Sequence, residues 1–268
     1  MITERNYQKI ADQARMSLIN KSEEIYERIH WGSSFSLMEI VSVLLGEKYN
    51  KETDVFLLSK GHGAPGVYAV MHELGELGDS LWDSYGEDGS PLSELMEYNP
   101  NHGFYCSGGS LGLAPSYGAG IALLKKHKNE KGRIYTLTGD GEMDEGSVWE
   151  AIASIAHYKL DNYTLIIDCN RLQSDGETSS VLKLPEFTKS LEAFGWNTTI
   201  VDGHDCDQIF QALSTENKND IPTAIICNTV KGKGVSFMEN QSVWHDRRMT
   251  KEEFEIARRE VMSRVADE

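Results

Sequence analysis

The 268-residue sequence lacks several features that mark common classes of protein. Its four cysteines form no Cys-x-x-Cys pair, which is typical of reduced thiols in a cytoplasmic protein. No stretch approaches 18 uninterrupted apolar residues, and the N-terminus has no apolar core of a signal peptide. We therefore expect a cytoplasmic protein without a membrane-spanning segment.

Positive charge is also scarce. The chain has 26 Lys and Arg against 42 Asp and Glu, which gives a net charge of −16. This balance argues against nucleic acid or an anionic membrane surface as a partner. A phosphorylated ligand would need local positive charge from a metal ion, from histidines or from a partner chain.

Internal repeats and low-complexity linkers are absent, and no Gly-x-Gly-x-x-Gly follows the first expected strand. The last absence disfavours a nicotinamide-binding Rossmann domain. Hydrophobic residues make up 40% of the chain, enough for a sizeable core. We interpret residues 1–268 as a single domain.

The central stretch predicts a strand, a helix and a second strand. β-branched and apolar residues fill 133–138 and 163–168, whereas helical spacing runs through 146–160. Two strands joined in this way lie parallel with a right-handed crossover. Further strands are expected at 55–59, 196–201 and 224–229. The fold class is therefore α/β, a doubly wound and mainly parallel sheet with helices on both faces.

Asp140 and Asn170 end the two central strands, so both side chains reach the same edge of the sheet. Mg²⁺ takes oxygen ligands and commonly bridges protein oxygens to substrate phosphates. Gly139 and Gly141 let a ligand approach the backbone closely. An isolated Gly-Asp-Gly is more often a simple turn, but its position favours a site for a metal ion and a diphosphate.

Other polar residues follow strand ends or lie in nearby loops. His62 follows the first strand and Lys231 the last, while His30 and His245 belong to loops. Taken singly, each is as readily a solvated turn residue. Helices are expected at 3–29, 37–45, 64–74, 114–126, 184–194 and 207–213, and from a Thr250–Glu253 capping box to residue 266. Irregular segments are expected at 30–36, 76–106 and 171–183.

Six segments carry a family resemblance. They are SKGHG at 59–63, GGSLG at 108–112, GDGEMDEGSVWEA at 139–151, AHYKLDNYTLIIDCNRLQSDG at 156–176, AFGWNTTIVDGHD at 193–205 and TVKGKGVSFMENQSVWH at 229–245. The sequence resembles the N-terminal, thiamine diphosphate-binding half of transketolase, in the form where the enzyme is split into two chains. The match spans nearly the whole chain and implies the thiamine diphosphate-binding fold of the diphosphate-binding (PP) type.

The resemblance implies roles for individual residues. Asp140, Asn170 and the Leu172 carbonyl look like metal ligands. His30 and His245 look like catalytic histidines, and Glu145 resembles an acidic residue that links two active sites across a dimer. The implied cofactor contacts are His62, Gly109, Ser110, Leu111, Asp140, Gly141, Glu142, Asn170 and His245.

The resemblance also implies an activity and a partner. Transketolases move a two-carbon ketol unit from a ketose phosphate to an aldose, with thiamine diphosphate and Mg²⁺ (or Ca²⁺ or Mn²⁺) as cofactors. The pyrimidine-binding and C-terminal domains are expected on a separate chain, in an α2β2 heterotetramer. We expect this chain to be inactive without that partner.

The sequence also departs from the family pattern around the substrate. Ile29 and Trp31 flank His30 where Gly and Pro are usual, and Asp246 follows His245 where Gly is usual. Leu95 or Met96 falls where the family has Gly-His-Pro. A specialised sugar substrate is one interpretation. A 2-oxoacid dehydrogenase component, a 1-deoxy-sugar synthase and a non-catalytic regulatory subunit remain alternatives.

Overall fold

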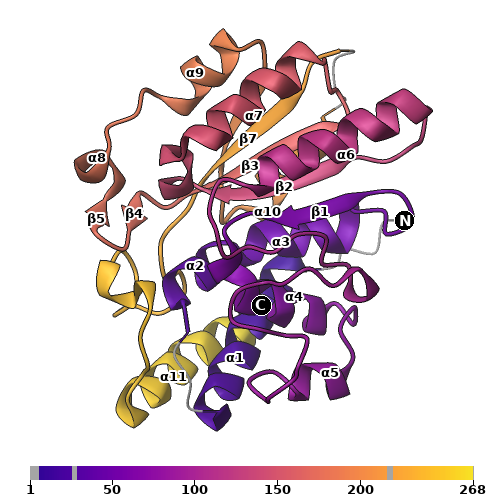
Figure 1. Cartoon of the computed structure of the whole chain (residues 1–268). Coiled ribbons are helices and arrows are strands. Elements are labelled where there is room, and N and C mark those ends of the chain that lie inside the picture. The colour runs from indigo at the N-terminus through magenta and orange to yellow at the C-terminus, as the bar shows by residue number, and fades with distance from the viewer. Residues whose placement is uncertain (1–5, 26–28, 216–219, 268) are drawn as a thin grey trace.

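The computed structural model describes residues 6–25, 29–215 and 220–267 and is built around one parallel sheet (Figure 1). Its five strands lie in the order β1-β2-β3-β7-β6, and every neighbouring pair is parallel. The strands are β1 Val55–Leu58, β2 Ile134–Gly139, β3 Tyr163–Cys169, β6 Asn197–Asp202 and β7 Thr223–Asn228. The predicted α/β fold is thus confirmed, and the carboxyl ends of the strands share one edge.

Helices cover both faces of the sheet because its central strands are apolar on both sides. On one face, Leu165 and Ile167 of β3 pack with α6 (Ala114–Lys128), α7 (Gly146–His157) and α9 (Phe187–Ala193). On the other face, Ile166 joins a separate apolar cluster. That second cluster includes residues of α1 (Tyr7–Ile25), α2 (Trp31–Ser36), α3 (Met38–Val43), α4 (Ala64–Glu73), α10 (Cys206–Ser214) and α11 (Lys251–Asp267).

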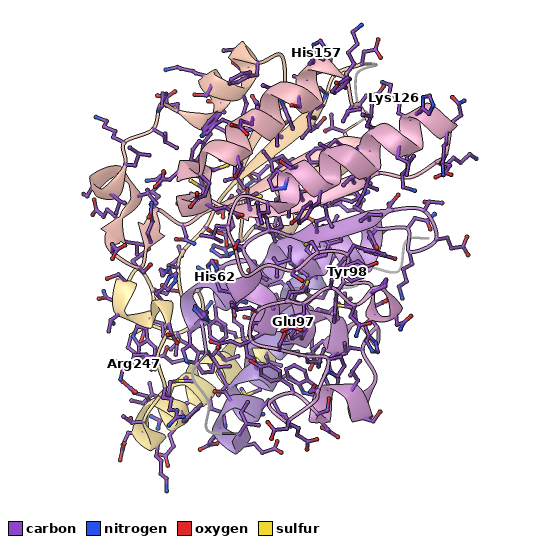
Figure 2. All side chains as sticks on the ribbon, in the orientation of Figure 1. His62, Glu97, Tyr98, Lys126, His157 and Arg247 are labelled. Atoms are coloured by element: carbon purple, nitrogen blue, oxygen red, sulfur yellow. The ribbon has the colours of Figure 1, made fainter. Side chains whose placement is uncertain are left out.

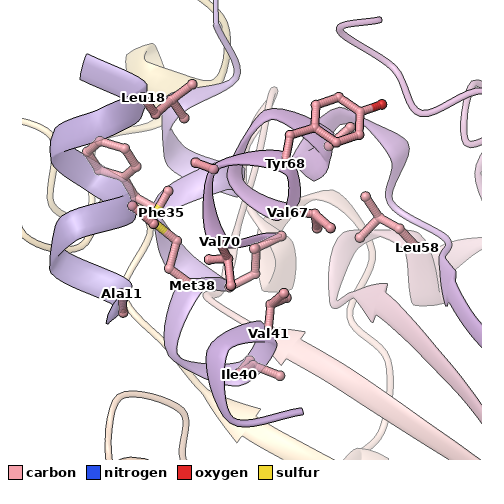
Figure 3. Packing of buried hydrophobic residues seen from close by; sticks show 14 of the residues in the cluster. Ala11, Leu18, Phe35, Met38, Ile40, Val41, Leu58, Val67, Tyr68 and Val70 are labelled. Carbon is pink, nitrogen blue, oxygen red and sulfur yellow. The ribbon is translucent and has the colours of Figure 1, made fainter. Parts of the chain in front are cut away.

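The second cluster forms the larger core (Figure 3). Phe35 and Met38 lie between α1 and α4, and Leu58 of β1 closes the cluster from the sheet side. All three side chains are fully buried. Burying side chains of this size stabilises the fold by roughly 2 kcal/mol each. This core holds α2 and the start of α4 against the strand ends.

Residues 30–36 were predicted as a polar loop, and this prediction is wrong for most of the segment. Residues 31–36 form α2, which is buried throughout. Trp31 and Phe35 anchor it in the core, and the Trp31 Nε1–H group donates to the Arg247 carbonyl at 2.9 Å. Tertiary packing has overridden a local sequence rich in Ser and Gly.

Both terminal helices also differ from the prediction. Helix α1 ends at Ile25, before the predicted Ile29, whose backbone instead pairs with Arg247. The predicted cap at Thr3 and residues 26–28 lie outside the described residues. The capping box of α11 is confirmed, because Thr250 N donates to Glu253 at 2.7 Å and Glu253 N donates to Thr250 Oγ1 at 3.2 Å. The helix is less solvated than its charges indicate, since Phe254 is buried and α11 packs on α1.

Two long connections contain short elements of their own. Segment 76–106 includes α5 (Asp79–Asp83), and segment 171–183 includes a hairpin of β4 (Leu172–Gln173) and β5 (Gly176–Glu177), followed by α8 (Thr178–Val181). Among the described residues, no helix is both long enough and apolar enough to cross a membrane.

Candidate functional site

A cavity of about 270 Å³ lies at the carboxyl ends of β1, β2, β3 and β7. It draws its walls from segments far apart in the sequence, as expected for an open parallel sheet. Most of the residues singled out from the sequence line this one cavity: His30, His62, Gly109, Leu111, Asp140, Gly141, Glu142, Asn170, Leu172, Lys231 and His245.

Asp140 follows β2 and begins a short 3₁₀ helix, Gly141–Asp144. Its Oδ1 atom accepts a hydrogen bond from Gly141 N at 2.9 Å, and its Oδ2 atom accepts one from Arg171 N. Burial, and then the charge of Asp168, raise the pKa of the Asp140 carboxyl to about 6. A nearby cation would lower this pKa again, so the Asp140 carboxylate is suited to bind a metal ion.

Asn170 and Leu172 contribute two further oxygens. Arg171 between them has a φ of 65°, so the chain turns sharply where β3 ends. The Asn170 Oδ1 atom accepts from Leu172 N at 3.1 Å, and the Leu172 carbonyl accepts from Lys231 Nζ at 3.2 Å. A carboxylate, an amide oxygen and a backbone carbonyl on one cavity wall are the ligand types that Mg²⁺ and Ca²⁺ take.

Two buried lysines supply positive charge in this acidic protein. Lys60 forms an ion pair with Asp168 beneath the cavity and also donates to Ser33 Oγ at 3.1 Å. Burial raises the pKa of Asp168, but the charge of Lys60 outweighs it and the net shift is downward. Burial, and then the charge of Lys60, lower the pKa of Lys231 to about 8. An anion in the cavity would stabilise the charged form of Lys231.

Three histidines meet at the cavity. The ring centroids of His30, His62 and His245 lie 5.3 to 5.4 Å apart. Burial, and then the charge of Lys60, hold the pKa of His62 well below its usual range. Burial, and then the charge of Lys231, lower the pKa of His245 to about 3, so both rings are neutral near pH 7. In Figure 2, His62 lies well away from Lys126 and His157, which are at the C-terminal ends of α6 and α7.

Two carboxylates that do not line the cavity lie beside His30, which does. The Glu94 Oε1 atom lies 2.8 Å from His30 Nδ1. A carboxylate oxygen of Asp246 joins them, and the three ligand-type atoms lie within 4.8 Å of one another. We refer to His30, Glu94 and Asp246 as the mouth of the cavity.

The glycine-rich segment at 108–112 passes very close to the turn after β1. A Cβ atom added at Gly61 would lie 2.3 Å from the Gly108 carbonyl oxygen, so a side chain cannot fit there. Gly109 and Leu111 line the cavity as a result. Ser110 and Glu145, which were also singled out from the sequence, are exposed and do not line it.

Glu142 is buried beside the cavity, and its carboxylate contacts protein groups. It accepts hydrogen bonds from Ser59 Oγ, from Gly112 N at 2.7 Å and from Gly139 N at 3.2 Å. Burial raises the pKa of this carboxyl. Glu142 therefore ties the ends of β1 and β2 to the turn at Gly112.

Sequence reasoning missed or left unassigned several residues of the site. Lys60 and Ser33 were not assigned, and Lys231 was noted at a strand end without a role. Lys60 could have been found from its place in SKGHG, directly after a strand. Ser33 gave no such signal, because α2 was predicted as a loop.

A larger cavity, of about 1,090 Å³, borders the other side of segment 169–172. Its walls include His204 and Lys233 but contain neither Asp140 nor the three clustered histidines. The smaller cavity therefore has the more specific chemistry.

Comparisons with known proteins agree with this geometry. Residues 7–263 match the family described as "Transketolase, thiamine diphosphate binding domain". The chain is 35% identical over 240 residues to one of the subunits of apulose-4-phosphate transketolase from Actinobacillus succinogenes, covering 87% of each chain. It is 33% identical over 237 residues to the 6-deoxy-6-sulfo-D-fructose transketolase subunit SqwG of a Clostridium species, covering 85% of this chain and 86% of that one.

Solved structures give the same result. Transketolase from Campylobacter jejuni superposes with a TM-score of 0.84 at 26% identity, covering 96% of this chain and 42% of that chain. This chain thus spans less than half the length of that transketolase. On the family match and the level of identity, the chain belongs to the transketolase family and contains its thiamine diphosphate-binding domain.

Proposed function

We propose that this chain is the thiamine diphosphate-binding subunit of a two-chain transketolase, which transfers a two-carbon ketol unit from a ketose phosphate or a related sugar to an aldose. The observation that carries the proposal is the single cavity that joins three metal-type oxygens to three histidines at the carboxyl edge of the sheet. Membership of the transketolase family supplies the reaction class.

The residues of the cavity fit thiamine diphosphate and a divalent cation. Asp140, Asn170 and the Leu172 carbonyl would hold Mg²⁺, or Ca²⁺ or Mn²⁺ in its place. Lys231 and His62 would face the diphosphate, because an anion needs cations or hydrogen-bond donors there. Gly109, Ser110, Leu111, Gly141, Glu142 and His245 complete the proposed contacts, with Glu142 acting through the backbone that it ties together.

The chemistry that thiamine diphosphate supplies when bound is attack on a donor carbonyl and storage of the electrons released when the carbon–carbon bond breaks. His245 accepts a hydrogen bond at Nδ1 from Lys231 Nζ, 3.0 Å away, which leaves its ring proton on Nε2. That proton can stabilise an oxyanion on the substrate. His30, whose ring lies beside that of His245, would exchange protons with substrate hydroxyls.

The proposal requires a partner chain. Both relatives described above are named as transketolase subunits, and this chain covers most of each. We propose that residues 1–268 form one domain and that the pyrimidine-binding and C-terminal domains come from the partner, in an α2β2 assembly. Exposed apolar residues on α6, including Tyr117 and Leu124, and exposed Glu145 offer a surface for that contact. The four unpaired thiols fit a cytoplasmic enzyme.

The substrate is proposed to be a specialised sugar. The two relatives are named for apulose 4-phosphate and 6-deoxy-6-sulfo-D-fructose, which are both unusual ketoses. In this chain Leu95 or Met96, and also Asp246, stand where the family usually has other residues. Leu95 lines the cavity, and Asp246 belongs to its mouth, where we propose that a donor enters.

The test is to purify the chain with and without a partner that resembles the remaining transketolase domains, and to measure ketol transfer with thiamine diphosphate and Mg²⁺. Activity is expected only with both chains and with a ketose phosphate rather than a 2-oxoacid. Turnover by the single chain would contradict the proposed division of the site. Absence of metal-dependent thiamine diphosphate binding would favour a non-catalytic subunit.

A further inference from the structure

The segment after β7, Val230–Gly234, carries Lys231 into the cavity. The Lys231 side chain is buried, and a Cβ atom added at Gly32 would lie 2.7 Å from its Cγ atom. Lys231 therefore runs directly over the backbone of α2. Its Nζ atom contacts the Leu172 carbonyl and His245 Nδ1. The position of this one amine therefore depends on how the backbone of Val230–Gly234 is held.

Two residues outside the 270 Å³ cavity hold that backbone on either side of Lys231. Val230 N donates a hydrogen bond to His204 Nε2 at 2.8 Å. On the other side, Arg15 Nε donates to the Lys233 carbonyl at 3.0 Å. His204 comes from the turn between β6 and α10, and Arg15 comes from α1, so neither belongs to the wall that contains Lys231.

Glu39 of α3 joins these two residues. Arg15 Nη2 lies 2.7 Å from each Glu39 carboxylate oxygen, and His204 Nδ1 lies 3.0 Å from Oε2. Arg15 and Glu39 are both fully buried. Burial raises the pKa of Glu39, but the charge of Arg15 outweighs it and lowers this pKa to about 2. The carboxylate is therefore ionised at neutral pH.

The partners of His204 fix its tautomer. The ionised carboxylate of Glu39 can only accept, so His204 Nδ1 carries the proton. Nε2 is then free of a proton and accepts from Val230 N, which is the arrangement the distances require. The chain of contacts runs from Arg15 through Glu39 and His204 to the backbone beside Lys231.

We propose that His204, oriented by Glu39, is a positioning residue for the cofactor site, because it fixes Val230 and thereby aims Lys231 at the diphosphate. The inference rests on the proposed function in that the ligand is thiamine diphosphate. Neither the family match nor the relatives described above assigns a role to His204, which does not line the cavity that contains Lys231.

The first test measures thiamine diphosphate affinity at fixed Mg²⁺ for His204→Ala, with His204→Gln as the conservative variant and exposed His127→Ala as the control. Loss of the acceptor for Val230 N is expected to weaken binding about tenfold. The Gln amide oxygen can take the place of Nε2, so His204→Gln is expected to lose roughly threefold or less. Unchanged affinity in His204→Ala would overturn the inference.

A second measurement separates positioning from a general structural defect. In a Lys231→Met background, His204→Ala is expected to have no further effect on affinity, because its effect passes through Lys231. An equal loss in both backgrounds would mean that His204 supports the fold at large, and the inference would fail.

A third measurement does not depend on the ligand. The Val230 amide is expected to exchange with solvent slowly in the wild type and in His127→Ala, and quickly in His204→Ala. Fast exchange in the wild type would contradict the inference by itself. If the wild-type chain bound neither thiamine diphosphate nor inorganic diphosphate, the proposed function would fail instead, while the exchange result would still decide whether His204 holds the segment.

Discussion

The two ends of the cavity are built in different ways. At the deep end, Asp140, Asn170 and Lys231 are at most 7% exposed, and each lies within three residues of the end of a strand. At the mouth, His30 and Asp246 are partly exposed, the Glu94 side chain is 44% exposed, and all three lie on irregular connections. The difference indicates that burial sets the electrostatics of the deep end, whereas the mouth is more open to solvent. Cofactor binding should depend on the first and donor choice on the second.

The largest effect should come from removing charge at the deep end. In Asp140→Asn the Mg²⁺ affinity is expected to fall by more than about 100-fold, because a direct ligand should matter more than an outer partner. Asp144→Asn, on the same 3₁₀ helix but outside the 270 Å³ cavity, is the control. Calorimetric titration with Mg²⁺ and thiamine diphosphate measures these affinities. Equal affinities in the two variants would mean that Asp140 is not a metal ligand.

Replacement of Lys231 should have the next largest effect. Lys231→Met keeps most of the length of the side chain but removes its charge, and thiamine diphosphate affinity is expected to fall about 10- to 100-fold. Lys233→Met is a matched control on the same segment, since Lys233 does not line the cavity and the substitution keeps the backbone carbonyl that Arg15 binds. Similar losses in both variants would point to a diffuse charge effect rather than a specific contact.

The raised pKa of Asp140 predicts how Mg²⁺ binding depends on pH. This carboxyl is ionised above about pH 6 and protonated below it, so a proton competes with the metal only on the acid side. Between pH 7 and pH 5 the affinity is expected to fall roughly tenfold, and above pH 7 Asp140 should contribute no further change. Mg²⁺ titrations at several pH values test this. A pH-independent affinity over that range would contradict it.

A substitution at the mouth should not change the affinity for the cofactor. Glu94→Gln is expected to keep the wild-type affinity for thiamine diphosphate and to change kcat/KM for the donor by up to about fivefold, the scale of a partly exposed ion pair. Glu97→Gln, on the same connection, is the control (Figure 2). Steady-state kinetics of the two-chain enzyme measures the ratio. A change in cofactor affinity would contradict the claim that cofactor binding depends on the deep end and donor choice on the mouth.

The same contrast explains how much could be predicted from the sequence. Asp140 and Asn170 could be brought together before any coordinates were known, because parallel strands end at one edge and a strand pattern fixes where they end. The contact of His204 with Val230 could not, because strand ends do not fix the conformations of the two turns, and that contact depends on how each turn folds. The position of Glu94 could not be predicted either, because residues 76–106 show no periodicity that would indicate which of their side chains face the cavity. Helix α2 was missed because Trp31 and Phe35 form it through burial rather than propensity.

The position of β7 has a consequence for how the protein is made. This strand lies between β3 and β6, although it follows both in the chain. Until residues 223–228 have been made, the edges of β3 and β6 that pair with β7 have no partner, and unpaired strand edges are prone to association. Lys231 and His245 leave the ribosome later still. The cofactor site is therefore completed only after His245 has been made, and a product that stops before β7 lacks both Lys231 and the strand that joins β3 to β6.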